Sequence, residues 1–239
     1  MQYKLEICAN SIESALVAQR GGADRIELCD NMAEGGTTPS AGMIKTCKKV
    51  LHIPVFPIIR PRGGGFVYTH EEFEVMKADI QICKDLGCEG VVLGILNTDG
   101  GIDKEKCAEL ISLARPMEVT FHRAFDCALH LEQSLEDIIA LGCERVLTSG
   151  GAEVADQSLP MIARLVRQAD SRIIVMPGSG ITEENLILVL KESGATEFHS
   201  TAKSLHLFLS HPDHTKIIEL NYYQTNFLRV SKMKKILLE

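Results

Sequence analysis

Short runs of apolar and β-branched residues alternate along the chain with segments of helical periodicity. The runs that read as strands are residues 3–9, 25–29, 55–60, 90–96, 119–123, 145–149, 172–177 and 197–200. The helical segments between them lie near 11–21, 41–51, 70–86, 104–114, 131–141, 158–169 and 183–193. Strands that alternate with amphipathic helices indicate βαβ units and a parallel sheet. Eight such units in 239 residues predict one α/β domain over 1–239, a closed (β/α)8 TIM barrel.

A weak internal repeat precedes every second predicted strand. Residues 22–28, 87–93 and 142–147 share a glycine followed by two further residues and then a strand-like run, and 194–199 follow the pattern loosely. Each is typical of a helix C-cap glycine with a tight turn into a strand. A repeat that spans two strands and two helices fits a barrel built from four similar units. The alternative is that all such turns look alike, and the fold prediction does not depend on the repeat.

The last residues form a basic amphipathic segment. Residues 222–239 place apolar side chains at helical spacing, with Arg229, Lys232, Lys234 and Lys235 among them. We interpret this segment as the last barrel helix, packed on the outside of the barrel. A helix that seeks a membrane surface is the alternative.

Composition and charge limit the possible partners. A net charge of −7 and a pI near 5.7 argue against a nucleic-acid-binding face, which would be basic. No stretch approaches 18 apolar residues, so no membrane span is expected. The first residues lack the long apolar region of a signal peptide. Together these features predict a cytoplasmic protein.

The cysteines are predicted to be reduced thiols, since the chain is large, has no export signal and contains no C-x-x-C pair. Cys8 and Cys29 fall at the predicted carboxyl ends of adjacent strands, where their sulfurs could meet. Thiolates select Cu(I), so this pair is the candidate metal site, with Cys127 as a weaker third candidate. Four further cysteines fall on predicted helices or helix ends, where a small buried hydrophobic residue is the default role: Cys47, Cys83, Cys107 and Cys143.

Polar residues gather where the predicted strands end, which is the functional face of a (β/α)8 barrel. Glu6 and Glu27 lie on neighbouring strands, and Arg60 and His122 end the third and fifth. These four residues are candidates for acid/base catalysis, with His122 as the general acid or base and a glutamate as its partner. An internal salt-bridge layer is the alternative for the glutamates, and a structural histidine is the alternative for His122.

A second group of residues suggests an anion-binding site. Glycines let a backbone approach an anion, and a helix that opens at Thr182 would aim free N–H groups at it. The alternative is a glycine-rich turn capped by Thr182. The candidate anion-binding residues come from the ends of strands three, six and seven: Arg62, Ser149, Gly150, Gly178, Ser179 and Gly180.

The strand-end motifs resemble the CutC family, described as copper homeostasis proteins with a (β/α)8 barrel. The resemblance extends from residue 3 to about 204, and past Ser204, in the segment 205–220, the sequence departs from the family pattern. The matching stretches are Glu6-Ile7-Cys8, residues 23–29, 35–40 and 59–64 with Phe66 and Tyr68, residues 120–126, 147–150 and 178–181, and Glu197-Phe198-His199-Ser200.

The resemblance implies a cytoplasmic homo-oligomer, most simply a dimer, with a role in copper tolerance or trafficking and with Cu(I) on cysteines such as Cys8 and Cys29. A copper carrier would not need all of the polar residues predicted at the strand ends. A TIM-barrel enzyme acting on a small phosphorylated or carboxylated metabolite therefore remains the rival prediction. A structural barrel that binds a partner on its outer helices is a third.

Overall fold

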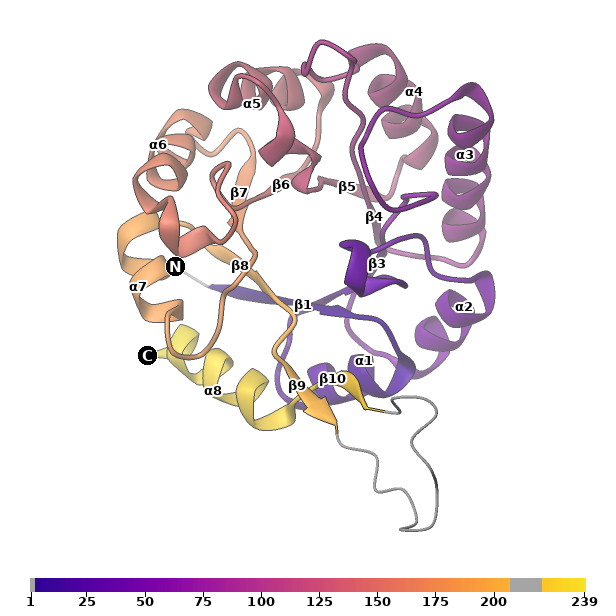
Figure 1. The fold of residues 1–239 in the computed structure, drawn as a ribbon. Coiled ribbons are helices and arrows are strands. Elements are labelled where there is room, and N and C mark those ends of the chain that lie inside the picture. Colours follow the sequence, from indigo (N-terminus) through magenta and orange to yellow (C-terminus); the bar gives the residue numbers. More distant parts are fainter. Residues whose placement is uncertain (1–2, 207–220) are drawn as a thin grey trace.

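A computed structural model describes residues 3–206 and 221–239. Eight parallel strands follow one another around a central ring, and Figure 1 looks down this ring. The strands are β1 (Lys4–Ala9), β2 (Arg25–Leu28), β3 (Val55–Pro57), β4 (Gly90–Leu93), β5 (Glu118–Phe121), β6 (Arg145–Thr148), β7 (Ile174–Pro177) and β8 (Glu197–Ser200).

Parallel pairing orders the strands into a barrel. One sheet runs β3-β2-β1-β8 and the other β4-β5-β6-β7, so the first strand pairs with the last. The sheets meet at a parallel bridge between Ile58 and Val92, beside which the Ile59 N–H donates to the Val92 carbonyl at 2.7 Å. On the opposite side β7 contacts β8. The predicted TIM-barrel fold is therefore confirmed.

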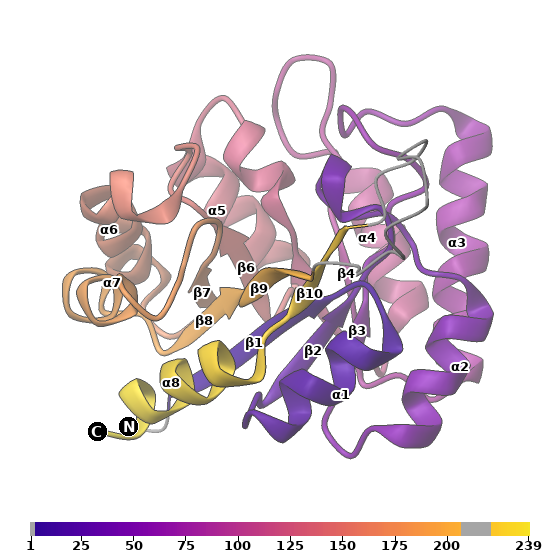
Figure 2. The same ribbon diagram turned by 60° about the horizontal axis from the view of Figure 1, so that its bottom comes forward.

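Helices cover the outside of the ring, with one helix between most successive strands (Figures 1 and 2). Side chains that cap the first turns explain several helix starts, since Ser11, Ser40 and Asp103 each accept a backbone N–H, and Thr69 forms a capping box with Glu72. The helices are α1 (Ile12–Arg20), α2 (Ala41–Val50), α3 (His70–Asp85), α4 (Lys104–Ala114), α5 (Leu131–Leu141), α6 (Leu159–Ala169), α7 (Leu186–Ser193) and α8 (Phe227–Leu238).

Strand residues alternate between two environments. Leu5 and Ile7 of β1 belong to the large apolar core between the strands and the helices. Cys8 instead belongs to a smaller cluster inside the barrel, and Glu6, which shares its face, is also buried. This alternation is the period of two expected of a strand. It brings the polar and thiol side chains to the interior and the mouth of the ring.

The observed elements differ from the predicted ones mainly at their ends. β3 ends at Pro57 and not at Arg60, and β4 ends at Leu93. The helix predicted from residue 183 becomes regular only at Leu186. The glycines predicted at helix ends before strands two, four, six and eight are all left-handed, since Gly22, Gly87, Gly142 and Gly194 have φ between 69° and 97°.

The tail was only partly predicted. Residues Tyr222–Thr225 form a strand, β10, antiparallel to β9 (Lys203–His206), so the prediction of a helix from residue 222 was wrong. The helix begins after Asn226, whose side chain accepts the N–H groups of two following residues. Its buried residues Val230, Met233 and Leu237 lie on α8, which packs beside α1 and α7 on the outside of the barrel, as expected. Of the altered segment 205–220, residues 207–220 lie outside the described part.

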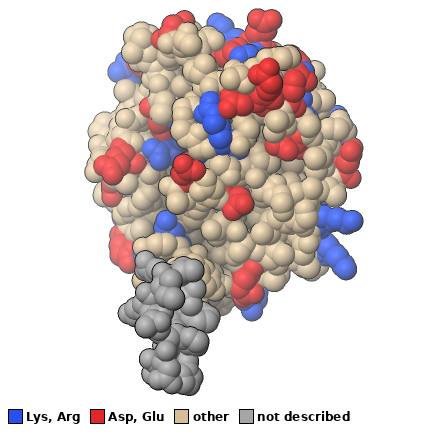
Figure 3. Space-filling model, turned by 45° about the vertical axis from the view of Figure 1, so that its right-hand side comes forward, with Lys and Arg blue, Asp and Glu red and all other residues tan. Residues whose placement is uncertain are grey.

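Charged side chains of both signs are intermixed on the face that carries α2, α3 and α4 (Figure 3). Among the residues that the structure describes, no helix combines the length and the apolarity needed to cross a bilayer.

Candidate functional site

A network of buried charges forms the floor of the barrel mouth. Arg25 on β2 donates through Nε to Glu6 and through Nη2 to Glu197 at 2.7 Å. Arg145 on β6 also donates to Glu197, at 2.8 Å. Both guanidinium groups pack against the Phe56 ring, whose centroid lies 5.1 Å from Arg25 and 5.5 Å from Arg145. The acids and bases of this layer therefore neutralise one another away from water.

Glu6 links this network to the rim. Burial alone would raise its pKa, but Arg25 and His199 overcome that effect and lower the pKa to about 2, so Glu6 is ionised at neutral pH. One oxygen lies 2.7 Å from Nδ1 of His199. Glu6, predicted as a catalytic carboxylate, thus lies beneath the pocket and holds the ring of His199.

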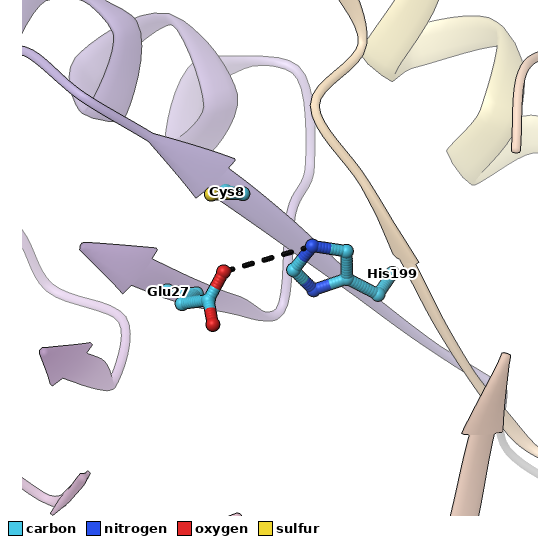
Figure 4. A group of neighbouring side chains, drawn as sticks. All are labelled: Cys8, Glu27 and His199. Atoms are coloured by element: carbon cyan, nitrogen blue, oxygen red, sulfur yellow. Dashed lines mark ion pairs between the residues drawn. The ribbon is translucent and has the colours of Figure 1, made fainter. Parts of the chain in front are cut away.

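Cys8, Glu27 and His199 meet above the network, and Cys29 lies beside Cys8. The Cys8 and Cys29 sulfurs are 3.4 Å apart, and both residues are buried. One ligand atom each from Cys8, Glu27 and His199 lies within 4.8 Å of the others. Figure 4 shows these three side chains converging from β1, β2 and β8, with the 3.6 Å contact between Glu27 and Nε2 of His199 drawn as a dashed line. The predicted pairing of the two thiols is present.

The environment sets the protonation of these groups. The hydrogen bond with Cys29 and burial raise the pKa of the Cys8 thiol well above its usual value. Burial also raises the pKa of Glu27. Burial would lower the pKa of His199, but Glu27 and Glu6 outweigh it and raise that pKa. The Cys8 thiol therefore keeps its proton at neutral pH, and a metal ion would displace that proton on binding.

The cluster opens into a pocket of about 480 Å³, far larger than one metal ion. Loops after several strands complete its wall, so the site combines polar groups with apolar surface. The lining residues include Cys8, Glu27, Cys29, Met32, Ile58, Arg60, Phe66, His122, Arg123, Leu147, Ser179, Gly180, Ile181 and His199.

His122 lies at the end of β5 and caps the short helix η2 (Arg123–Cys127). Its Nδ1 accepts the Ala124 N–H at 3.2 Å, and its buried Nε2 has no partner among the described residues. Burial, reinforced by the charge of Arg60, lowers the pKa of His122 to about 3. The ring is therefore neutral, with its proton on Nε2, and this N–H is a hydrogen-bond donor without a partner in the described structure.

Arg60 reaches the same pocket but is held by the backbone. Its Nη1 donates to the carbonyls of Glu34 and Gly36 at 2.7 Å, and its Nη2 donates to the carbonyl of Gly64 at 2.7 Å. The guanidinium stacks on Phe66, with the ring centroid 5.0 Å away. Arg60 thereby orders the loops after β2 and β3 around the mouth.

Three of the candidate anion-binding residues have other partners. Arg62 does not line the pocket, since it pairs with Glu72 and stacks on Tyr68. Ser149 donates from its N–H and its hydroxyl to the Asp126 carboxylate at 2.9 and 3.0 Å. The Gly150 N–H donates to the hydroxyl of Thr148 at 2.8 Å. The turn after β6 is thus filled by a carboxylate of the chain itself.

The loop after β7 is left-handed at two positions that line the pocket. Ser179 has a φ of 76° and Gly180 a φ of 70°, and both residues line the pocket. Gly178 packs against His199, because a Cβ there would come within 3.2 Å of the histidine Cβ. The Thr182 N–H, predicted to be free for an anion, instead donates to Oδ1 of Asn185 at 2.8 Å. That part of the prediction was wrong.

Sequence reasoning did not assign a role to His199, although the period of two places it beside Glu197 on strand eight. The role of His199 depends on the strand register, because β8 pairs with β1 and places His199 opposite Glu6. Arg123 and Asp126 fix their loop through a 2.8 Å ion pair and through the contacts of Asp126 with Ser149.

Comparison with known proteins agrees with this fold and these motifs. The CutC family model matches residues 3–204. The chain belongs to the CutC family. A human relative called copper homeostasis protein cutC homolog is 54% identical over 202 residues, which cover 84% of this chain and 74% of the relative. A solved CutC structure from Streptococcus agalactiae is 36% identical, covers 83% of this chain and 98% of its own, and superposes with a TM-score of 0.80.

More distant structures share the fold alone. A thiamine phosphate pyrophosphorylase from Pyrococcus furiosus covers 99% of this CutC chain and 96% of its own, with a TM-score of 0.62 at 13% identity. The barrel is thus common to several proteins, whereas the strand-end motifs are those of CutC.

Proposed function

We propose that this CutC chain binds Cu(I) at the barrel mouth through the thiolates of Cys8 and Cys29, with His199 as a third donor. The 3.4 Å separation of the two buried sulfurs carries the proposal. Sulfur and imidazole donors suit a soft metal such as Cu(I) better than a hard cation. Relatives are named for copper homeostasis, and we extend a role in copper tolerance or trafficking to this chain, in the reducing cytoplasm.

Glu6 supports the proposed third donor as a positioning residue. Its carboxylate accepts a hydrogen bond from Nδ1 of His199 at 2.7 Å, which leaves Nε2 facing Cys8 and Glu27. A carboxylate behind a metal-binding histidine fixes the tautomer and the ring orientation. The ionisation of Glu6, stabilised by Arg25, makes it suited to this task.

Cys8→Ser and Cys29→Ser are each expected to weaken Cu(I) binding at least about 100-fold, because each removes a thiolate ligand. The measurement is titration of the reduced protein with Cu(I) in competition with a chelator. Cys127→Ser is the matched control, since Cys127 is exposed and lies outside the pocket. Equal affinities for all three variants and the unmodified chain would mean that copper does not bind at this pair.

Glu6→Gln is expected to weaken Cu(I) binding about tenfold, because the amide holds His199 less firmly than a carboxylate does. The control is Glu118→Gln, whose half-exposed side chain pairs with Arg145 outside the thiol cluster. X-ray absorption on the copper-loaded protein should show a nitrogen donor beside sulfur in the unmodified chain. A sulfur-only spectrum, together with unchanged affinity in Glu6→Gln, would remove His199 from the proposed site.

The rival prediction, acid/base catalysis by His122, needs an imidazole that exchanges protons near neutral pH. Burial lowers the pKa of His122 to about 3, so its ring is neutral and does not exchange protons near neutral pH. For that reason the proposed function rests on the thiols, and His122 is considered separately below.

A further inference from the structure

Arg60 differs from the other buried arginines. Within residues 3–206 and 221–239, the buried arginines are Arg25, Arg60 and Arg145. Arg25 pairs with Glu6 and Glu197, and Arg145 pairs with Glu197 and Glu118. Arg60 is only 4% exposed and has no carboxylate partner among the residues described. A buried charge without a counter-charge is costly, so its presence calls for an explanation.

The hydrogen bonds of Arg60 leave part of its guanidinium free. Of its five N–H groups, two on Nη1 and one on Nη2 have backbone carbonyl acceptors. The buried Nε has no partner in the described part of the chain. These carbonyls satisfy hydrogen bonds but bring no negative charge. The side chain lines the pocket, where an anion could supply that charge.

His122, which lines the same pocket, carries a second donor without a partner among the described residues. Because its Nδ1 accepts from Ala124, the neutral ring carries its proton on Nε2, and this buried N–H is also unpartnered in the described structure. Arg60 and His122 contact the same Phe66 ring, each at 5.0 Å from its centroid. Both side chains therefore pack against the Phe66 ring, and each has an N–H group without an acceptor in the described structure.

We propose that Arg60 and His122 bind the carboxylate or phosphate group of a small organic anion in this pocket. Donors without acceptors, one of them charged, match a fully ionised oxyanion. Phe66, Ile58 and Met32 provide apolar surface beside them for the body of the ligand. This anion site lies in the same pocket as the thiols but needs neither of them, so it does not depend on the copper proposal.

In the turn after β6, a similar set of donors already binds a carboxylate of the chain itself. Arg123 pairs with Asp126 at 2.8 Å, and the same carboxylate accepts the N–H groups of Ser149 and Gly151. The Asp126 carboxylate thus occupies the donors of that turn. Arg60 and His122 have no such internal anion in the described residues, so an external one completes their contacts.

The test uses the reduced, metal-free protein and two separate probes, inorganic phosphate and acetate. Binding is followed by the ¹⁵N–¹H signal of the His122 ring in NMR spectra and by calorimetry. We expect saturable binding that shifts this signal. Tighter binding of phosphate would assign a phosphorylated ligand, and tighter binding of acetate would assign a carboxylate ligand.

Arg60→Lys is expected to weaken binding of the probe about tenfold, since lysine does not reproduce the fixed geometry of the guanidinium. Arg60 also orders its loops, so His122→Asn serves as the variant that preserves folding. Asparagine is a good N-cap and can still accept from Ala124, but it lacks Nε2, so a similar weakening is expected. Arg172→Lys, at an exposed pair with Glu136, is the control and should bind as the unmodified chain does.

Absence of saturable binding by both probes, or equal binding in Arg60→Lys, His122→Asn and the unmodified chain, would overturn the proposal. The double variant Cys8→Ser/Cys29→Ser should retain anion binding while it loses Cu(I). This result separates failure of the anion site from failure of the copper site.

Discussion

Arg25→Met is expected to lower the free energy of unfolding by about 3–5 kcal/mol, the cost of leaving buried carboxylates without their counter-charge. Arg25 joins Glu6 and Glu197, which are 1% and 3% exposed. Methionine fills similar space but offers no donor to either acid. Urea unfolding at pH 7 measures the effect. Arg172→Met is the matched control, because it breaks an exposed pair and should cost about 1 kcal/mol or less.

The pH dependence of this loss identifies its source. The pKa of Glu6 is lowered from 4.5 to about 2 in the folded protein. Its contribution to stability is therefore present above about pH 4.5 and is lost as the pH falls towards 2. Without Arg25 the lowering is smaller, so the stability gap between Arg25→Met and the unmodified chain should narrow over that range. A gap of the same size at pH 7 and pH 3 would mean that lost packing, and not lost charge pairing, causes it.

Gly90→Ala is expected to destabilise the protein by about 3 kcal/mol, the upper part of the usual cost of overpacking. A Cβ at position 90 would lie 2.3 Å from Cε2 of Phe56. That ring cannot move freely, because it is only 2% exposed and packs against the guanidinium groups of Arg25 and Arg145. Thermal or urea unfolding measures the loss. Gly65→Ala is the control, since a Cβ there meets no atom within 4 Å.

A second substitution shows whether the collision is the cause. Phe56→Leu removes the ring that the new methyl group would meet. The double variant Gly90→Ala/Phe56→Leu should be more stable than the sum of the two single losses predicts, by about 1 kcal/mol or more. Strictly additive losses, or a Gly90→Ala variant as stable as Gly65→Ala, would contradict this account of the barrel interior.

The sequence predicted the barrel well because its signal is periodic and local. The alternation that places Leu5 outside and Glu6 inside is visible in the letters alone, and so are the glycines that end helices before alternate strands. The strand ends were less predictable. Arg60 was expected to end β3, but the strand ends at Pro57, and no local pattern shows where ladder pairing stops.

The pairing of Cys8 with Cys29 could be predicted because adjacent strands and a period of two bring them together. The partner of each charged residue could not. Arg62 and Arg60 are two residues apart, yet one pairs with Glu72 on α3 and the other enters the pocket. His199 acquires its place from β8 closing onto β1, which is a contact between the two ends of the barrel. Tertiary register decides such roles, and one sequence does not contain it explicitly.

The Asp126 carboxylate has one further consequence. By accepting hydrogen bonds from Thr148, Ser149 and Gly151, it fastens the end of η2 to the turn after β6. His122 caps the start of η2, so the imidazole stands at the beginning of a segment secured at its far end. A ligand that meets this ring finds it already oriented, and little conformational entropy is lost when the contact forms.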